Sequence, residues 1–232
     1  MPMKNIDNSI DFATVLASAV HDMKNSLCLL MQSIENLTDS IDTKNKSTRH
    51  HLASAHYEAS RLNTGLVQLL SLYRAGLNSL PVNIDQHYVE DIVDEILASN
   101  ENYLQHKKIN LKVKQTENLA WFLDADLICI LLNDMLINAM RYTKLNILLS
   151  VYTEDGYLIF TLEDDGPGYP ESMLAAVDIK MQHFDISQGR TGLGLFFARL
   201  IAQAHTNDDK QGCIYLKNGG SLGGSVFTLK LP

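Results

Sequence analysis

The sequence predicts an α+β protein in which a long helical hairpin precedes an α/β sandwich with a mostly antiparallel sheet. Apolar residues recur every three or four positions through residues 9–43, with no glycine or proline among them. The helical pattern breaks at residues 78–81, which end in Pro81. Strand-like and helical segments then alternate. We therefore expect a helical domain over residues 9–77 and a mixed domain over residues 84–232.

Composition describes an ordinary soluble chain. Its 232 residues are 46% hydrophobic and 20% charged, and the net charge of -8 argues against a broad nucleic-acid surface. Three separated cysteines, Cys28, Cys129 and Cys213, indicate neither a zinc site nor a disulfide framework. No apolar run has the length of a membrane span, and the N-terminus lacks an apolar signal core. We expect a cytoplasmic protein with no direct membrane insertion.

Two helices are expected in the first domain, over residues 9–43 and about 48–76. Their apolar seams contain Leu16, Val20, Met23, Leu27, Leu30, Ile34, Leu37 and Ile41, then Leu52, Ala55, Ala59, Leu62, Leu66, Leu69 and Tyr73. One hairpin buries a single stripe on each helix and has little core of its own. Pairing two hairpins provides that core, which predicts a homodimer through residues 9–77 as a four-helix bundle.

In the second domain, helices are expected over residues 88–105, from Asp124 or Asp126 to about Tyr142, and over residues 191–205. Strands are expected over residues 109–113, 146–152, 157–162, 213–217 and 225–231. Asp155-Gly156 between two of these strands is a strong hairpin signal. We expect the helices to cover one face of an antiparallel sheet.

The most distinctive part of the first domain is the segment from residue 18 to residue 27. On a helix, His21 and Asn25 share a face, and Asp22 lies beside them. A nucleophile next to a carboxylate on an exposed face can carry chemistry. Taken alone, the segment is better explained as a solvated polar face that includes one histidine.

Residues 133–143 place polar groups on a predicted helix of the second domain. Asp134 and Asn138 are one turn apart and offer hard oxygen ligands for Mg²⁺ with a polyphosphate, while Arg141 adds a cation. The alternative is an amphipathic helix with a solvent-exposed polar face. For this segment taken alone, that alternative is favoured.

Two glycine-rich segments follow. In the first, Asp164 ends a strand, and Gly166 and Gly168 let the backbone approach a ligand. In the second, Gly192-Leu193-Gly194 leads into a helix whose N-terminal N–H groups suit phosphate. The alternatives are a tight acidic turn and a common loop before a helix.

In order and spacing these segments resemble the sensor histidine kinases of two-component systems. The ATP-binding part of the resemblance is of the type shared with gyrase, Hsp90 and MutL, and the whole extends from about Phe12 to Pro232. Residues 21–27 resemble the histidine box and residues 134–143 the asparagine box. Residues 164–168 and 192–195 resemble the two glycine boxes, and residues 223–232 resemble the terminal strand, with Thr228.

The resemblance implies a role for each matching position. His21 would accept the γ-phosphoryl group of ATP, Asp22 would hydrogen-bond its other ring nitrogen, and Asn25 would orient water for dephosphorylation of the regulator. Asn138, with Asp134, would hold Mg²⁺. The implied ATP-binding set is Asn138, Arg141, Tyr142, Asp164, Gly166, Gly168, Gly192, Leu193, Gly194 and Thr228.

Several positions depart from the family pattern. Asp134 stands where most of these kinases have Asn, and Ser26 occupies a position that is often Pro. Between Gly168 and Gly192 there is no clear Phe-x-Pro-Phe segment, so the cation that contacts the phosphates is either Lys180 or Arg190.

We therefore expect a dimeric histidine kinase that uses ATP and Mg²⁺, autophosphorylates His21 and passes the phosphoryl group to the receiver domain of a response regulator. Its signal would come from a separate sensor protein or a ligand. One alternative is a phosphotransfer or scaffold dimer with a vestigial ATP domain. Another is a serine kinase of the anti-sigma type on the same ATP fold.

Overall fold

The computed structural model divides the chain into two compact units, Met1–Tyr73 and Arg74–Pro232. The structure describes residues 23, 25–34, 36–37, 48, 52, 55, 59, 62, 65, 80, 82–176 and 192–232.

In the first unit, every described residue is helical. Ile34 and Ala59 are buried, whereas Met23, Leu30, Leu37 and Leu62 are about half exposed or more. The unit therefore presents apolar side chains to solvent at several positions of the predicted seam.

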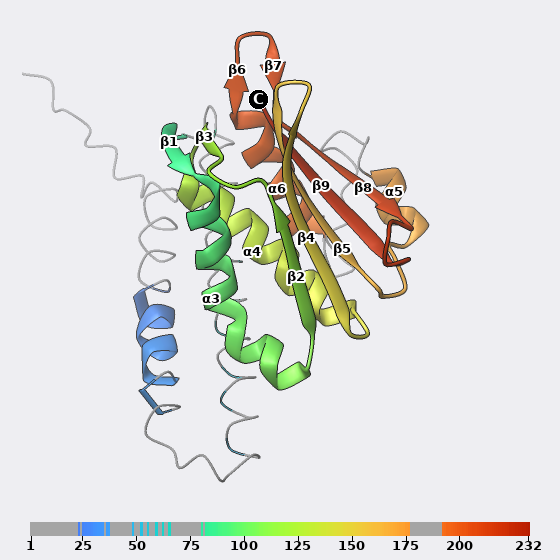
Figure 1. Ribbon diagram of the computed structural model, residues 1–232. Coiled ribbons are helices and arrows are strands. Elements are labelled where there is room, and N and C mark those ends of the chain that lie inside the picture. The colour runs from blue at the N-terminus through green and yellow to red at the C-terminus, as the bar shows by residue number, and fades with distance from the viewer. Residues whose placement is uncertain are drawn as a thin grey trace, which may run out of the picture. The chain divides into compact units, whose positions relative to one another are not determined.

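The second unit is built on a five-stranded sheet with the order β2-β4-β5-β9-β8 (Figure 1). Its strands are β2 (Asn110–Gln115), β4 (Asn146–Glu154), β5 (Tyr157–Asp164), β8 (Cys213–Asn218) and β9 (Ser225–Leu231). The β4–β5, β5–β9 and β9–β8 pairs are antiparallel, and β2 lies parallel to β4. The prediction of a mostly antiparallel sheet is confirmed, with β2 as the exception.

Three helices lie along one face of this sheet: α3 (Val89–Lys107), α4 (Ala125–Tyr142) and α6 (Gly192–Ala204) (Figure 1). The central helix, α4, contacts both α3 and α6 as well as β5. The remaining elements are β1 (Asp85–Tyr88), β3 (Ala120–Leu123), α5 (Glu171–Ala176), β6 (Thr206–Asn207) and β7 (Lys210–Gln211), with β1 paired to β3 and β6 to β7.

Local signals explain where several elements begin and end. Asp124 caps α4 because its carboxylate accepts from the Leu127 N–H at 3.0 Å, the bond expected of an N-cap side chain. The β4–β5 turn has positive φ at both Asp155 (53°) and Gly156 (73°), the backbone that a two-residue hairpin of this twist requires. Both features match the sequence prediction.

The core fills the space between the sheet and the helices. On β5 the side chains of Leu158, Phe160 and Leu162 are buried, and on β9 the paired Leu231, Leu229 and Phe227 are buried opposite them. Residues two apart on a strand share a face. The next position on β5 is therefore Asp164, so a row of apolar side chains ends on a carboxylate.

Candidate functional site

Asp164 is a buried carboxylate at the end of the central strand β5. It is 2% exposed. Its Oδ1 accepts from the N–H groups of Gly166 at 2.7 Å and Ser225 at 3.3 Å, and its Oδ2 accepts from the Ser225 hydroxyl. Burial of a charged group requires such partners. The charge is thus held in one orientation by β9 and by the loop after β5.

Two glycines allow backbone segments to meet around Asp164. A Cβ on Gly166 would lie 2.5 Å from the carbonyl oxygen of Tyr142 and 2.9 Å from Asp164 Oδ1. A Cβ on Gly224 would lie 2.5 Å from the same Oδ1 and 2.4 Å from the Asp164 carbonyl oxygen. No side chain fits at such distances. Glycine at position 166 therefore lets the end of α4 approach the Asp164 loop, and glycine at position 224 lets the chain just before β9 approach Asp164.

The loop after Asp164 is fastened to the end of β8. Gly168 has φ of 82°, and its position faces the Asn218 side chain. Asn218 accepts from the Tyr169 N–H at 2.7 Å and donates to the Tyr169 carbonyl oxygen at 2.9 Å. Gly168 therefore provides the left-handed backbone conformation that this loop requires. The next residue, Tyr169, is fixed because both its N–H and its carbonyl oxygen are hydrogen-bonded to Asn218.

Asp165 organises the α4–β4 connection and is not one of the hydrogen-bond partners of the Asp164 side chain. Its carboxylate accepts from the Thr143 hydroxyl at 2.6 Å, from the N–H groups of Lys144, Leu145 and Asn146, and from the Asn146 amide. Burial opposes ionisation, but the hydrogen bonds from residues 143–146 outweigh it and hold the pKa of Asp165 well below its usual range. Asp165 thus joins the end of α4 to the Asp164 loop.

Helix α4 supplies the other predicted polar residues. Asp134 and Asn138 are half-buried and one turn apart, while Arg141 and Tyr142 are exposed at the C-terminal end. Asn133 plays a different part, because its side chain accepts from the Asn100 amide of α3 at 2.7 Å. Asn133 therefore makes a structural contact with α3, and at the end of α4 the Tyr142 carbonyl oxygen adjoins Gly166 in the loop after Asp164.

The predicted glycine segment 192–194 forms the start of α6, which begins at Gly192 and runs for 13 residues. Gly192 and Leu193 lie in the first turn, and Gly194 is half-buried. A helix start leaves N–H groups without partners in the helix itself, and such groups suit anions.

Thr228 does not join the Asp164 cluster. It pairs with Thr161 on β5 and with Tyr215 on β8, whereas Asp164 shares its face with Leu162. Three positions separate residues 225 and 228, so their side chains lie on opposite faces of β9. The residue of β9 that contacts Asp164 is Ser225. The expectation that Thr228 contributes to ATP binding stays a prediction. Phe227 pairs with Leu162 of β5, and Ser225 lies two residues before Phe227 on the same face of β9. The pairing of β5 with β9 therefore identifies Ser225 as the neighbour of Asp164.

The residues expected to react lie in the first unit. His21 and Asp22 lie outside the described residues. Asn25 and Ser26 are helical and exposed. The structure therefore describes the segment around Asp164 in detail and only one of the predicted reactive residues, Asn25.

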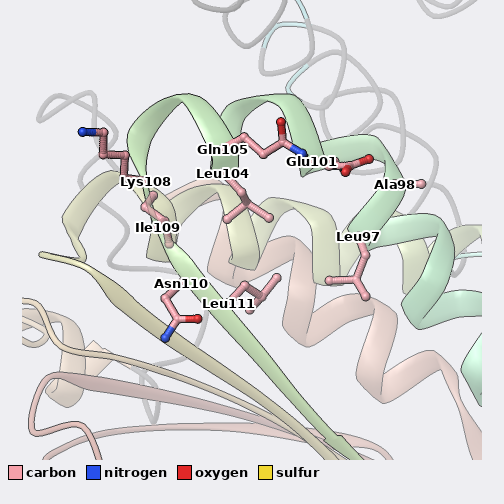
Figure 2. A pocket seen from close by; sticks show the side chains of 9 residues that line it. All are labelled: Leu97, Ala98, Glu101, Leu104, Gln105, Lys108, Ile109, Asn110 and Leu111. Atoms are coloured by element: carbon pink, nitrogen blue, oxygen red, sulfur yellow. Dashed lines mark hydrogen bonds between the residues drawn. The ribbon is translucent and has the colours of Figure 1, made fainter.

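A separate groove of about 620 Å³ lies between α3 and β2. Figure 2 shows Leu97, Leu104 and Leu111 pointing towards this space, with Lys108 directed away from it. Asp164 does not line this groove, which belongs to the opposite edge of the sheet from β8.

Among the described residues, no helix is both long and apolar enough to cross a membrane.

Residues 123–232 match the family model described as histidine kinase-, DNA gyrase B-, and HSP90-like ATPase. This match starts at the end of β3 and covers α4, the Asp164 loop, α6 and the last strand. The matched segment therefore contains the whole cluster around Asp164.

The chain is also similar to sensor protein SrrB of Staphylococcus aureus (strain NCTC 8325 / PS 47), with 26% identity over 224 residues. That alignment covers 94% of this chain and 37% of SrrB, so the chain spans little more than a third of the relative's length.

Two solved structures share the fold. The Acinetobacter baumannii histidine kinase AdeS is 22% identical with a TM-score of 0.59, and the alignment covers 89% of this chain and 95% of AdeS. Full-length ShkA in complex with AMPPNP is 19% identical with a TM-score of 0.63, covering 95% of this chain and 46% of ShkA.

Proposed function

We propose that this chain, whose residues 123–232 match the model of the histidine kinase-, DNA gyrase B-, and HSP90-like ATPases, is the ATP-dependent core of a protein-histidine kinase. The observation that carries the proposal is the buried Asp164 carboxylate, fixed by Gly166 and Ser225 at the end of β5. A carboxylate accepts but does not donate, so it suits the exocyclic amine of adenine.

The base site consists of Asp164 with its two glycines, Gly166 and Gly168. Tyr142 is 45% exposed, and its carbonyl oxygen adjoins Gly166, so its ring is available to line the base. Arg141 precedes it at the end of α4 and supplies a cation for the nucleotide.

The phosphate side of the site is formed by α4 and α6. Asn138 and Asp134 offer oxygen ligands one turn apart on α4, a donor set that fits Mg²⁺ shared with a polyphosphate. A metal held there would supply positive charge that partly neutralises the phosphates. Gly192, Leu193 and Gly194 present the first N–H groups of α6 to the phosphates.

The phosphoacceptor is His21. One of its ring nitrogens attacks the γ-phosphorus, the bond from that phosphorus to the β–γ bridging oxygen breaks, and ADP leaves with the electron pair. Asp22 hydrogen-bonds the other ring nitrogen and stabilises the cationic imidazole. The phosphoryl group then passes from His21 to a receiver-domain aspartate of a response regulator, and Asn25 orients the water that hydrolyses the aspartyl phosphate to aspartate and inorganic phosphate.

Residues 9–77 form the dimerisation domain, and residues 84–232 form the catalytic domain. The exposed apolar side chains of Met23, Leu30, Leu37 and Leu62 support a homodimer, because pairing two copies removes them from water. A four-helix bundle built from two hairpins would place both His21 residues on its outer surface. A separate sensor protein or a ligand would supply the signal.

The direct test is incubation of the chain with ATP labelled at the γ-phosphate. We expect the wild-type protein to gain label and the His21→Gln variant to gain none. Label in phosphohistidine is lost in acid, whereas phosphoserine retains it, so acid treatment separates this function from that of a serine kinase. Equal labelling of wild type and His21→Gln would reject the assignment of His21, and failure of the wild type to bind ATP in calorimetry would indicate a scaffold.

A further inference from the structure

The strand β2 forms one edge of the five-stranded sheet, and its main-chain groups alternate between the two sides of the strand. Asn110 donates its N–H to the Leu145 carbonyl oxygen at 2.7 Å. Thr116 donates its N–H to the Val151 carbonyl oxygen at 3.1 Å in the same parallel register with β4. The N–H and C=O groups of successive strand residues point to opposite sides. The odd-numbered residues therefore point these groups away from β4, and they are Leu111, Val113 and Gln115.

The side chains of β2 alternate between an apolar face and a basic face. Leu111 and Val113 are paired with buried residues of β4, so they face the helices. Lys112 and Lys114 lie on the other face and are exposed. Residues 102–116 contain four lysines and no acidic residue, whereas the whole chain has a net charge of -8. This edge of the sheet is therefore a basic segment of an acidic protein.

The groove between α3 and β2 lies beside the apolar face of this edge. Its volume is about 620 Å³, and Leu97 and Leu104 of α3 point into it together with Leu111 of β2 (Figure 2). Among the described residues that line it, the one acidic group is Glu101, which accepts a hydrogen bond from the Gln105 amide at 2.9 Å. A strand added to β2 would lie about 4.8 Å farther out and would direct every second side chain towards this groove.

We propose that β2 and this groove form a docking site for an extended segment of a partner protein in which apolar and acidic residues alternate. The main chain of the segment pairs with the outward groups of β2, its apolar side chains enter the groove, and its carboxylates lie beside Lys112 and Lys114. In such strand addition the main-chain bonds supply affinity, and the pockets for alternate side chains supply specificity. A second copy of this chain is the poorer occupant, because pairing two β2 edges would set lysines against lysines. The inference does not depend on the proposed kinase activity.

Amide hydrogen exchange of the full chain, followed by NMR, tests the pairing at each residue. The probe is a seven-residue peptide with blocked ends that alternates glutamate and valine. At saturation we expect exchange at Leu111, Val113 and Gln115 to slow by at least about fivefold, the effect of one main-chain hydrogen bond. The N–H groups of Lys112 and Lys114 point towards β4 and should change little. Uniform slowing along β2, or no slowing at all, would overturn the proposal.

Two methylated probes distinguish strand addition from attachment through side chains alone. One carries N-methyl groups on its valines and the other on its glutamates, so each lacks the N–H groups on one side of its strand. Because an added strand pairs through one side only, calorimetry should find that one of these probes loses its affinity and the other keeps it. Equal affinities of the two methylated probes would reject pairing through the main chain.

Charge variants test the basic face of β2. Lys112→Gln and Lys114→Gln should each weaken binding of the glutamate-valine probe about twofold to fivefold at low salt, as expected of one exposed ion pair. Lys217→Gln is the matched control, because Lys217 is an exposed lysine on β8 at the opposite edge of the sheet. It should not change the affinity. A loss in Lys217→Gln as large as in the β2 variants would place the peptide elsewhere and overturn the proposal.

A proline variant removes one outward donor of β2. Gln115 is exposed, so Gln115→Pro deletes its N–H without deleting a core side chain, and proline is tolerated on edge strands where the N–H faces outward. We expect it to weaken binding of the probe about threefold to tenfold, whereas Gln115→Ala keeps the N–H and should bind as the wild type does. Equal affinities of the proline and alanine variants would count against the site, and the methylated probes examine the same pairing on the unaltered chain.

Discussion

The imidazole of His205 accepts a hydrogen bond from the main-chain N–H of Asp124 at 3.0 Å, although 81 residues separate the two. The other ring nitrogen, Nδ1, lies 2.8 Å from the Ile201 carbonyl oxygen and donates to it. Only the neutral ring with its proton on Nδ1 makes both contacts, because protonation of Nε2 removes the acceptor for the Asp124 N–H. His205, at the end of α6, thereby joins this helix to the capped start of α4.

This arrangement makes stability depend on pH. Burial lowers the pKa of His205 below 6.5, opposed by the Ile201 carbonyl and the Asp124 charge. As pH falls, His205 is protonated at a higher pH in the unfolded chain than in the folded chain. The stability that the neutral ring contributes is therefore complete above about pH 6.5 and decreases as pH falls towards the lower pKa of the folded chain. We expect the free energy of unfolding to fall by roughly 1 kcal/mol between about pH 7.5 and 5.5.

Denaturant titrations followed by tryptophan fluorescence measure this change, since Trp121 is the one tryptophan of the chain. His205→Gln should remove most of the pH dependence in this interval, and His87→Gln should retain it. An unchanged slope in His205→Gln would assign the effect to other groups.

Asp165→Asn should destabilise the second unit by about 1–3 kcal/mol at neutral pH, because several donors of residues 143–146 lose a charged acceptor. In the wild type the pKa of Asp165 lies below its usual range, so its contribution is present above about pH 4 and is lost as pH falls through the folded value. Thermal unfolding at neutral and acidic pH measures both effects.

Asp155→Asn is the control for Asp165→Asn. Asp155 lies in the β4–β5 turn with φ of 53°, a conformation that asparagine also adopts. We expect it to change stability by less than about 0.5 kcal/mol. Similar losses in the two variants would contradict the special role of Asp165.

Gly166→Ala should abolish ATP binding or prevent folding of the second unit. The added methyl group would lie 2.5 Å from the Tyr142 carbonyl oxygen, and main-chain atoms cannot give way cheaply. Gly65→Ala is its control, because nothing lies within 4 Å of the new atom and the position is helical. It should be neutral or stabilising. Normal ATP affinity in Gly166→Ala would refute the close approach of α4 to the Asp164 loop.

Cys129 should resist alkylation. Burial raises the pKa of its thiol to about 12, with further increases from the Glu95 charge, a hydrogen bond to Glu95 and the Asp126 charge. The thiolate is the reactive form. After brief iodoacetamide treatment at about pH 8, peptide mass spectrometry should find label on the exposed Cys28 well before Cys129. Glu95→Gln should accelerate labelling of Cys129, and equal rates at Cys28 and Cys129 in the wild type would contradict the prediction.

Sequence patterns predicted the elements that carry a strong local signal. The capped helix α4, the hairpin at Asp155-Gly156 and the last two strands all lie within a few residues of the expected positions. Asp164 was also identified from its place between a strand and a glycine loop. In each case the signal is contained in a short stretch of chain.

The features that sequence patterns missed depend on distant partners. The strand β1 has the polar sequence Asp-Gln-His-Tyr and exists through its pairing with β3, whose residues follow more than thirty positions later. Ser225 and Gly224 reach Asp164 only because β9 pairs with β5, and this register is not encoded in the sequence of either strand alone. The parallel pairing of β2 with β4 likewise has no signature in β2 itself.

That parallel strand has a consequence for behaviour at high concentration. Within the described chain β2 pairs only with β4, so its other edge offers unpaired main-chain groups to a neighbouring molecule. Its outward-facing residues include Lys112 and Lys114, both exposed, and edge lysines oppose strand addition by another copy. Replacing these two charges with valine should promote edge-to-edge association and precipitation, measured by light scattering at increasing concentration.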